Sequence, residues 1–170
     1  APTPVGTIAA QTGTDAQAGI SLATAGAFTD IDNGALSYSA AGLPAGLSIN
    51  PATGLISGTI DASASQGGTA GVYSVTITAT DAGGLTTTQT FSWTVTNPAP
   101  TAANDTASVA EDGSTTIAVL ANDGDPDGDP LTVTSATALH GSVTINPDGS
   151  LTYTPDANYH GADTISYTLS

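Results

Sequence analysis

The residues best suited to chemistry lie in one stretch, residues 122–130, which reads NDGDPDGDP. Its four carboxylates belong to Asp123, Asp125, Asp127 and Asp129, and the chain has no Lys or Arg to balance them. Carboxylates this close repel one another unless a cation lies between them. Hard oxygen ligands on a glycine-containing turn suit Ca²⁺, which takes about six to eight oxygens. The stretch therefore predicts a calcium site.

Two other interpretations of this stretch remain open. An EF-hand loop also begins D-x-D-x-D-G, but the twelfth position counted from Asp123 is Thr134 rather than Glu. Sequence typical of strands also flanks the loop, which argues against the helices of an EF-hand. The second alternative is an acidic loop that is simply solvated and binds no metal.

Composition indicates an all-β protein with an acidic surface. The formal net charge is −15, only 9% of residues are charged, and 39% are hydrophobic, so the chain can build a core. Thr and Val are abundant and the helix formers Glu, Lys and Gln are scarce, which favours strands. An acidic surface repels phosphate backbones and anionic membranes, so we expect neither nucleic acid nor a lipid surface as a partner. The absence of Cys excludes disulfides and thiolate zinc sites.

Short segments of alternating polarity recur through both halves of the chain. In the first half, strands are expected at about 5–10, 19–26, 35–40, 46–49, 55–60, 72–80 and 86–96. In the second half they are expected at about 105–110, 114–121, 131–138, 141–146, 150–154 and 163–170. Residues 1–4 are expected to be linker, and prolines at 98 and 100 mark a boundary between 1–97 and 98–170. The predicted fold is two tandem Ig-like β-sandwiches.

The two halves are divergent copies of one plan. The hairpin around residues 49–55 aligns with residues 145–151, and Val75, Ile77 and Ala79 align with Ile165, Tyr167 and Leu169. On this register the second module lacks its last strand. A sandwich without that strand exposes a sheet edge and an apolar groove. Either the chain is a segment of a longer array, as its start at APTP without Met suggests, or a neighbouring chain donates the strand.

Several motifs resemble known families of surface modules. Residues 42–48 (GLPAGLS) with 53–59 (TGLISGT) resemble the dystroglycan-type, Putative-Ig cadherin-like modules. Residues 104–106 (NDT), 111–113 (EDG), 119–123 (VLAND) and 153–156 (YTPD) resemble bacterial cadherin-like repeats. Such repeats occur in tandem in giant RTX-type adhesins of bacterial surfaces, although the G-G-x-G-x-D nonapeptide of RTX calcium rolls is absent here.

The resemblance implies calcium clamped at the junction of the two modules. Loop alternation in an Ig-like sandwich leads to the same expectation, in which Asp15, Asp61 and Asn97 share an ion with Asp125, Asp127 and Asp129. Asp30, Asp32 and Asp81 would form half of a site towards a preceding module, and Glu111 half of a site towards a following one. Asp105 is expected to bind metal or to begin a strand. In the first module Gly34 replaces the third carboxylate and Asp15 is shorter than Glu111, which should weaken coordination there.

No catalytic constellation is expected. His140 and His160 are the only histidines, and no G-x-S-x-G sequence accompanies the many Ser and Thr residues. Trp93 is expected in the core. Tyr38, Tyr153 and Tyr159 are expected to pack in the core or at its rim, with a sugar-stacking platform as the alternative.

We therefore expect a structural, non-enzymatic role on the bacterial cell surface. The modules are predicted to be calcium-stiffened extenders of a large adhesin, whose partners are neighbouring modules of the same parent chain. The alternatives are a filament repeat completed by a donated strand, and a carbohydrate- or peptide-binding module of a secreted protein.

Overall fold

The computed structural model of the chain describes residues 1–32 and 34–170, so Asn33 of the first acidic loop lies outside the described part. It consists of β-strands and three short 3₁₀ turns at Ala25–Ala27, Ala64–Gln66 and Val119–Ala121. No α-helix occurs among the described residues, which confirms the all-β prediction. The chain divides into two compact units, Ala1–Pro98 and Ala99–Ser170, called here the first and second unit.

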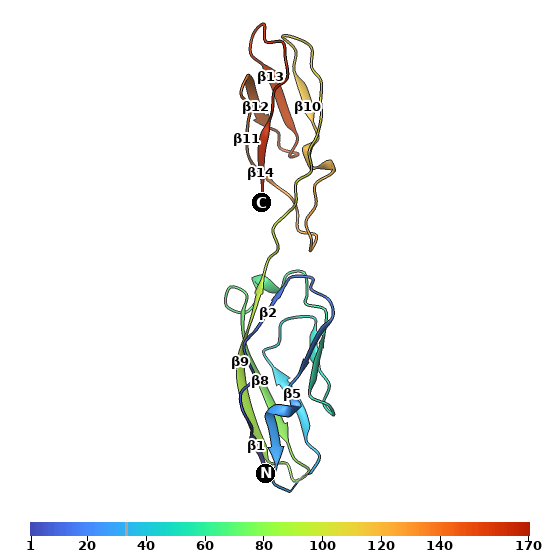
Figure 1. Ribbon diagram of the computed structural model, residues 1–170, viewed down its shortest axis with the longest axis vertical. Helices are drawn as coiled ribbons and strands as arrows, with labels where there is room; N and C mark the ends of the chain where they lie inside the picture. The colour runs from blue at the N-terminus through green and yellow to red at the C-terminus, as the bar shows by residue number, and fades with distance from the viewer. Residues whose placement is uncertain (33) are drawn as a thin grey trace. The chain divides into compact units, whose positions relative to one another are not determined.

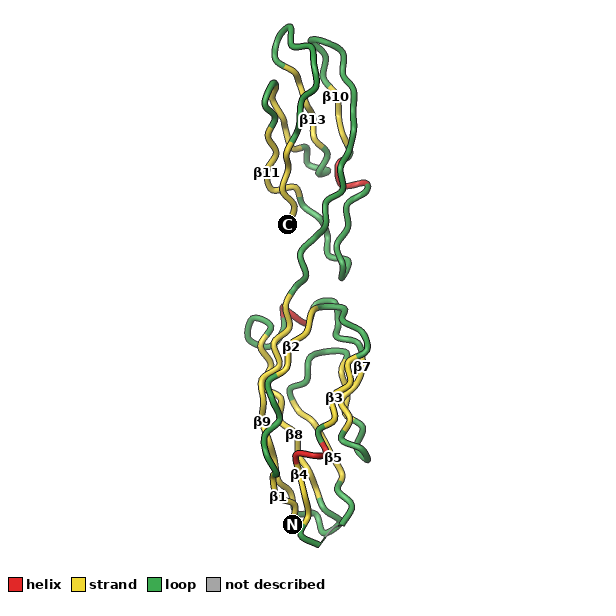
Figure 2. The backbone as a smooth tube through the Cα atoms, viewed as in Figure 1, coloured by secondary structure: helices red, strands yellow, loops and turns green. Residues whose placement is uncertain are grey.

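The first unit is a sandwich of two sheets and an additional strand pair (Figures 1 and 2). One sheet has the order β2-β9-β8-β5, built from Gln11–Thr14, Thr86–Thr96, Val72–Thr80 and Ser37–Ala41. The other has the order β3-β7-β6, built from Ile20–Ala23, Leu55–Gly58 and Leu47–Ile49. In the additional pair, β1 (Pro2–Pro4) runs antiparallel to β4 (Phe28–Asp30).

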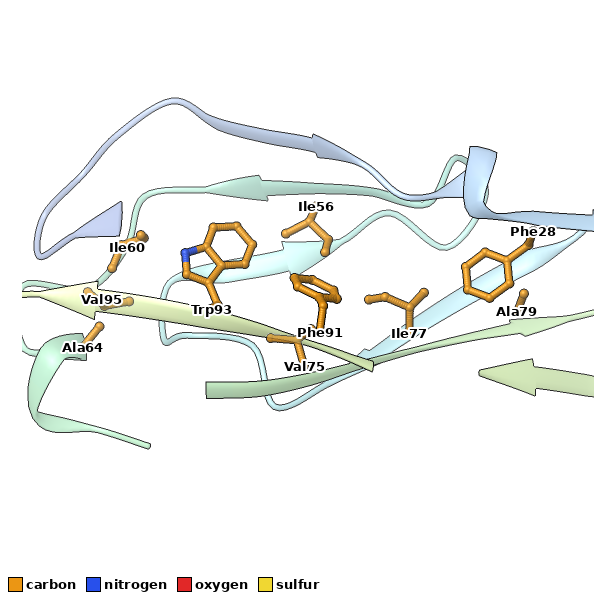
Figure 3. Close-up of a cluster of buried hydrophobic side chains, with 10 residues drawn as sticks. All are labelled: Phe28, Ile56, Ile60, Ala64, Val75, Ile77, Ala79, Phe91, Trp93 and Val95. Atoms are coloured by element: carbon orange, nitrogen blue, oxygen red, sulfur yellow. The ribbon is translucent and has the colours of Figure 1, made fainter. Parts of the chain in front are cut away.

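Alternation along the long strands β8 and β9 forms the core of the first unit. Val75, Ile77 and Ala79 point inward from β8, and Phe91, Trp93 and Val95 point inward from β9 (Figure 3). The intervening threonines and serines face outward, as expected when successive side chains alternate between the two faces of a sheet. Trp93, only 1% exposed, is a core residue as predicted.

The start of the chain differs from the sequence prediction. The expected strand at 5–10 was wrong, because the first strand of the main sheet lies further on, at Gln11–Thr14. The Ile8 N–H instead donates to the side chain of Gln89, at 3.1 Å, so it does not form a backbone ladder there. Residues 2–4, expected to be linker, form the edge strand β1, a position where proline is tolerated because the outer edge needs no N–H donor.

The second unit repeats the first with part of one sheet missing. Its sheet β10-β13-β12, built from Thr115–Ile117, Leu151–Pro155 and Gly141–Ile145, has the same order as β3-β7-β6. Its other sheet contains only β11 (Val133–Thr137) and β14 (Ser166–Leu169), the counterparts of β5 and β8. No described strand corresponds to β9, which confirms that the second unit lacks its last strand.

The absence of that strand also explains why the strand predicted at 105–110 was wrong. In the first unit β2 pairs with β9 alone. Without a counterpart of β9, the matching segment of the second unit has no ladder to join, and residues 102–110 have no assigned strand. Only an isolated bridge, between Thr101 and Gly124, remains at the position of the β1–β4 pair.

Truncation of Ile77 to alanine tests this core directly. Ile77 is fully buried, so Ile77→Ala should destabilise the first unit by about 2–5 kcal/mol through lost burial and a residual cavity. Val72→Ala is the matched control on the same strand, since Val72 is 44% exposed and should lose less than about 1 kcal/mol. Urea unfolding followed by fluorescence of Trp93, the chain's one tryptophan, measures both changes. Equal losses in the two variants would contradict the assigned core.

Candidate functional site

The acidic loop of residues 125–129 is organised by the first of its carboxylates. Asp125 Oδ1 accepts hydrogen bonds from the backbone N–H groups of Asp127, at 3.1 Å, and Asp129, at 3.3 Å. Gly128, with φ of +86°, supplies the left-handed residue that the turn requires. The loop is thus folded around Asp125 by its own backbone, and Asp127 lies within the turn.

Asp125 and Asp127 form a pair that cannot easily be doubly ionised. Both carboxylate oxygens of Asp127 are buried and have no hydrogen-bond donor. A proton on Asp127 can donate to Asp125, which, with burial and the charges of Asp125 and Asp129, raises the pKa of Asp127 to about 6. The same hydrogen bond lowers the pKa of Asp125. Below about pH 6 the pair therefore holds one proton, and at higher pH a cation would supply the missing positive charge.

A second carboxylate cluster surrounds the hydroxyl of Tyr167. Asp123 Oδ1 accepts the Ala103 N–H at 2.8 Å, and the Tyr167 hydroxyl donates to Asp123 Oδ2 at 3.1 Å. Because a hydroxyl has a single hydrogen, nearby Asp105 is left with a buried Oδ2 that has no donor. Burial, with the charges of Asp123 and Asp105, raises the pKa of Tyr167 to about 12. Asp123 therefore has a structural role here, while Asp105 retains a free ligand oxygen.

In the first unit, Asp15 and Asp61 lie at the same end. Asp15 follows β2 and is only 3% exposed; its Oδ1 accepts the Ser65 N–H at 2.8 Å, while its Oδ2 is buried without a donor. Asp61 accepts the hydroxyl of Ser63 at 2.8 Å and its N–H at 3.0 Å, which lowers the Asp61 pKa. Burial raises the pKa of Tyr73, and the negative charges of Asp15 and Asp61 raise it further. All three groups therefore share one electrostatic environment.

Asp30 and Asp81 lie close together in the first unit. The amino group of Ala1 lies 3.6 Å from Asp30 Oδ1 and 3.6 Å from Asp81 Oδ2. Asp30 also accepts the Asp32 N–H at 3.0 Å, which places Asp32 beside the pair. The N–H groups of Leu85 and Gly83 donate to Asp81 and lower its pKa. The structure thus brings together two of the three carboxylates predicted for this half-site, with the third on the adjoining turn.

Two predicted ligands lie outside these clusters in sequence. Glu111 is exposed at the rim of a groove in the second unit, and Asn97 directly follows β9. Within residues 1–32 and 34–170, no three Asp, Glu or His side chains form a cluster that could hold a metal ion alone. Backbone carbonyls and water would have to complete any calcium site. The assignment of the twelve residues as calcium ligands stays a prediction.

Sequence reasoning missed Asp163, a well-satisfied carboxylate of the second unit. It accepts the His140 N–H at 2.9 Å and the Tyr153 hydroxyl at 2.8 Å, while the His140 ring stacks on Tyr159 with centroids 4.4 Å apart. Burial alone would raise its pKa, but these bonds and those from Thr164 and Leu139 hold the Asp163 pKa at about 2. A single Asp outside any acidic run gives no sequence signal for this role.

The tyrosines have structural roles rather than forming an exposed platform. Tyr38 packs against Phe28 in the core of the first unit, with ring centroids 6.1 Å apart. Tyr153 is 6% exposed in the second unit, and Tyr159 stacks on His140. This agrees with the core-or-rim interpretation. Among the described residues, no helix is both long and apolar enough to cross a membrane.

Comparison with known families assigns a model to each half of the chain. Residues 1–96 match the family model described as Putative Ig domain, and residues 97–170 match the model described as Bacterial Ig domain. The chain therefore contains tandem Ig-like repeats. No curated protein matches the chain in sequence.

Solved structures resemble the chain at low sequence identity. The first two cadherin domains of human protocadherin-24 are 18% identical, with a TM-score of 0.44 over 99% of this chain and 93% of that one. Extracellular cadherin domains 3–6 of protocadherin gamma B2 are 14% identical, with a TM-score of 0.48 over 100% of this chain and 46% of that one. An endo-fucoidan hydrolase of glycoside hydrolase family 107 is 16% identical, with a TM-score of 0.46 over 99% of this chain and 28% of that one.

Asp163→Asn should change how the stability of the second unit depends on pH. The pKa of Asp163 is about 2 in the folded unit and about 3.9 when unfolded, so its contribution is present above pH 4 and is lost as the pH falls towards 2. The variant should be less stable at pH 5, and the difference from the parent should shrink towards pH 2. Hydrogen exchange of the buried Leu151 amide reports on this unit.

Asp112→Asn is the control, since Asp112 has φ of +56°, which Asn tolerates, and its side-chain oxygen can still accept the Asn158 N–H. This variant should keep the pH profile of the parent. An unchanged pH profile in Asp163→Asn would show that Asp163 does not stabilise the fold.

Proposed function

Because the chain belongs to the Putative Ig domain family through residues 1–96, we propose that its units are calcium-stiffened spacer modules of a large bacterial cell-surface adhesin. The match of residues 97–170 to a Bacterial Ig domain supports a bacterial source and a repeat architecture. The observation that carries the proposal is the Asp125–Asp127 pair, whose buried Asp127 oxygens have neither an N–H donor nor a basic side chain.

The donor chemistry of both units fits Ca²⁺. In the second unit Asp125, Asp127 and Asp129 would hold the ion, and in the first unit Asp15 and Asp61 offer carboxylate oxygens at one end. All are hard oxygen ligands, and no thiolate exists in the chain to favour a softer metal. Bound calcium would supply the positive charge that the chain lacks. The expectation that these residues and Asn97 share one ion stays a prediction.

The proposed role is mechanical, and no reaction is assigned to the chain. Ca²⁺ would replace repulsion among ionised carboxylates with shared ligation, which restricts motion of the acidic loops and of the proline-containing segment 97–100. An acidic surface with no basic side chain keeps such a chain soluble and repels anionic surfaces. Neighbouring modules of the same parent would be its partners, outside the cell, where calcium is abundant.

Calcium should raise the thermal stability of the chain at neutral pH. For a site with Kd of about 10⁻⁴–10⁻³ M, usual for extracellular modules, 10 mM Ca²⁺ would add roughly 1.4–2.7 kcal/mol. Asp127→Asn should remove most of the gain in the second unit, because an amide keeps the size but not the charge. Asp156→Asn, at an exposed position outside the loop, should retain it. Melting curves in calcium and in chelator measure the difference, and equal gains in both variants would contradict the assignment.

Stiffening is tested separately by small-angle X-ray scattering. Chelation should change the maximum dimension of the parent chain. In Asp127→Asn, calcium should have little effect on that dimension. An identical maximum dimension with and without calcium would exclude the spacer-stiffening role, even if calcium binds.

A further inference from the structure

Residue 1 and the end of β9 lie at opposite ends of the long sheet of the first unit. The amino group of Ala1 is 3.6 Å from Asp81, which lies in the turn between β8 and β9. From that turn β9 runs along the sheet to Thr96, and the chain then continues into residues 97–100 (Figure 1). Opposite pulls on Ala1 and on the segment after β9 therefore stretch the first unit along its strands.

The first strand of the main sheet is bonded to the last strand of the same unit. β2 runs parallel to β9, with four residue pairs from Gln11 and Trp93 to Thr14 and Thr96. The Asp15 N–H extends this ladder by donating to the Thr96 carbonyl at 3.1 Å. No other described strand pairs with β2. The β2–β9 ladder therefore ties the start of the main sheet to the strand that leaves the unit.

Parallel pairing decides how this ladder responds to tension. Opposite pulls on the start of β2 and on the end of β9 slide the two strands past each other. Because the ladder hydrogen bonds join the strands from side to side, such sliding strains all of them together. Pulling the two strands apart from the same end would instead open the bonds one after another. The sliding geometry resists a larger force, since several bonds share the load.

The neighbouring ladders make β2 the strand that decides the resistance. β9 is held on its other side by nine residue pairs with β8, and its Phe91, Trp93 and Val95 side chains are buried in the core. β1 pairs with β4 over only three residues, and two of these, Pro2 and Pro4, have no N–H to donate. β1 should therefore detach before β2, and β9 should detach last.

Contacts of β2 and of the residue that follows it add to the backbone ladder. Asp15 is only 3% exposed, and its Oδ1 accepts the N–H of Ser65, in the 3₁₀ turn Ala64–Gln66, at 2.8 Å. Hydrogen bonds to a carboxylate are stronger than those between neutral groups. Gly13 lets β2 lie close to the core, because a Cβ at this position would be 2.6 Å from Ile60 Cδ1. β2 cannot slide along β9 without breaking the bond between Asp15 and Ser65 as well.

We propose that the β2–β9 ladder and the Asp15–Ser65 bond form a shear clamp, a set of bonds that resists stretching of the first unit along the chain. The clamp deepens the proposed spacer role and rests on it for the source of tension, because a spacer carries any force that acts on its parent protein. Calcium would restrict the motion of loops and of segment 97–100, whereas the clamp restricts extension of the unit itself. The bonds of the clamp form without an ion.

The direction of pulling tests the clamp without a core substitution. The chain has no Cys, so two introduced cysteines define where force is applied. In the 170-residue chain, Ala1→Cys with Ala99→Cys loads β2 and β9 in shear, whereas Ala18→Cys with Ala99→Cys pulls them from the same end. All three alanines are exposed. Single-molecule force spectroscopy in chelator should give a larger rupture force for the first pair. Equal forces, or a larger force for the second pair, would overturn the proposal.

Two alanine variants test the part played by Asp15. Asp15→Ala removes the bond to Ser65, so the shear rupture force should fall towards the force measured from the same end. Ile56→Ala is the control, because Ile56 is fully buried on β7, outside the β2–β9 ladder. This control should lower the stability to urea but retain most of the difference between the two directions, since forced unfolding follows the unfolding barrier rather than the equilibrium stability. An unchanged shear force in Asp15→Ala, or equal losses in both variants, would contradict the role of Asp15.

The clamp and the calcium-stiffened spacer can fail separately. A rupture force that depends on direction, in a chain whose maximum dimension does not respond to calcium, would support the clamp and refute the stiffening. A dimension that responds to calcium, together with a rupture force that is the same in both directions, would support the stiffening and overturn the clamp.

Discussion

Every carboxylate of this chain must find hydrogen-bond donors or counter-charge without help from a basic side chain, because the sequence has 15 Asp and Glu and no Lys or Arg. Most of these carboxylates accept hydrogen bonds from backbone N–H groups or from side-chain hydroxyls. Asp125 accepts two N–H groups of its own loop, Asp61 accepts Ser63, and Asp163 accepts His140 and Tyr153. Carboxylates therefore act as turn and loop organisers as well as surface charges.

A smaller group is left with oxygens that no donor reaches. Asp15, Asp105 and Asp127 each have a buried carboxylate oxygen without a partner among the described residues. Burying an ionised oxygen without a donor is costly, and a bound cation would offset that cost. For Asp127 the cost appears as a raised pKa. The calcium proposal follows from this balance of charge rather than from the acidic composition alone.

The sequence predicted those parts of the fold in which each strand carries its own signal. β8 and β9 have the predicted bounds because nine and eleven residues alternate without interruption. The segment 105–110 has strand-like residues but no ladder, since strand formation there depends on a partner that local propensity cannot reveal. Near the start of the chain, the Ile8 N–H donates to the side-chain oxygen of Gln89, 81 residues away, and the first strand of the main sheet begins only at Gln11.

The candidate site was predictable to a similar extent. The density of carboxylates in residues 122–130 identified the acidic loop, and the alternation of loops in an Ig-like sandwich pointed to Asp30 and Asp81 as neighbours. No residue pattern indicated that the Asp123 carboxylate would accept hydrogen bonds from Ala103 and Tyr167, or that Asp163 would accept the His140 N–H. Such roles depend on which N–H and O–H groups the tertiary fold leaves nearby, and a residue type alone does not encode them.

The central claim is that Asp127 exchanges a proton for a calcium ion. The most direct measurement is the pH titration of its carboxyl carbon by ¹³C NMR, with and without Ca²⁺. The account predicts a midpoint near pH 6 in chelator, moved below pH 4 by saturating calcium, because a bound cation favours the ionised form. A midpoint near pH 4 in chelator, or one near pH 6 that calcium does not move, would contradict it.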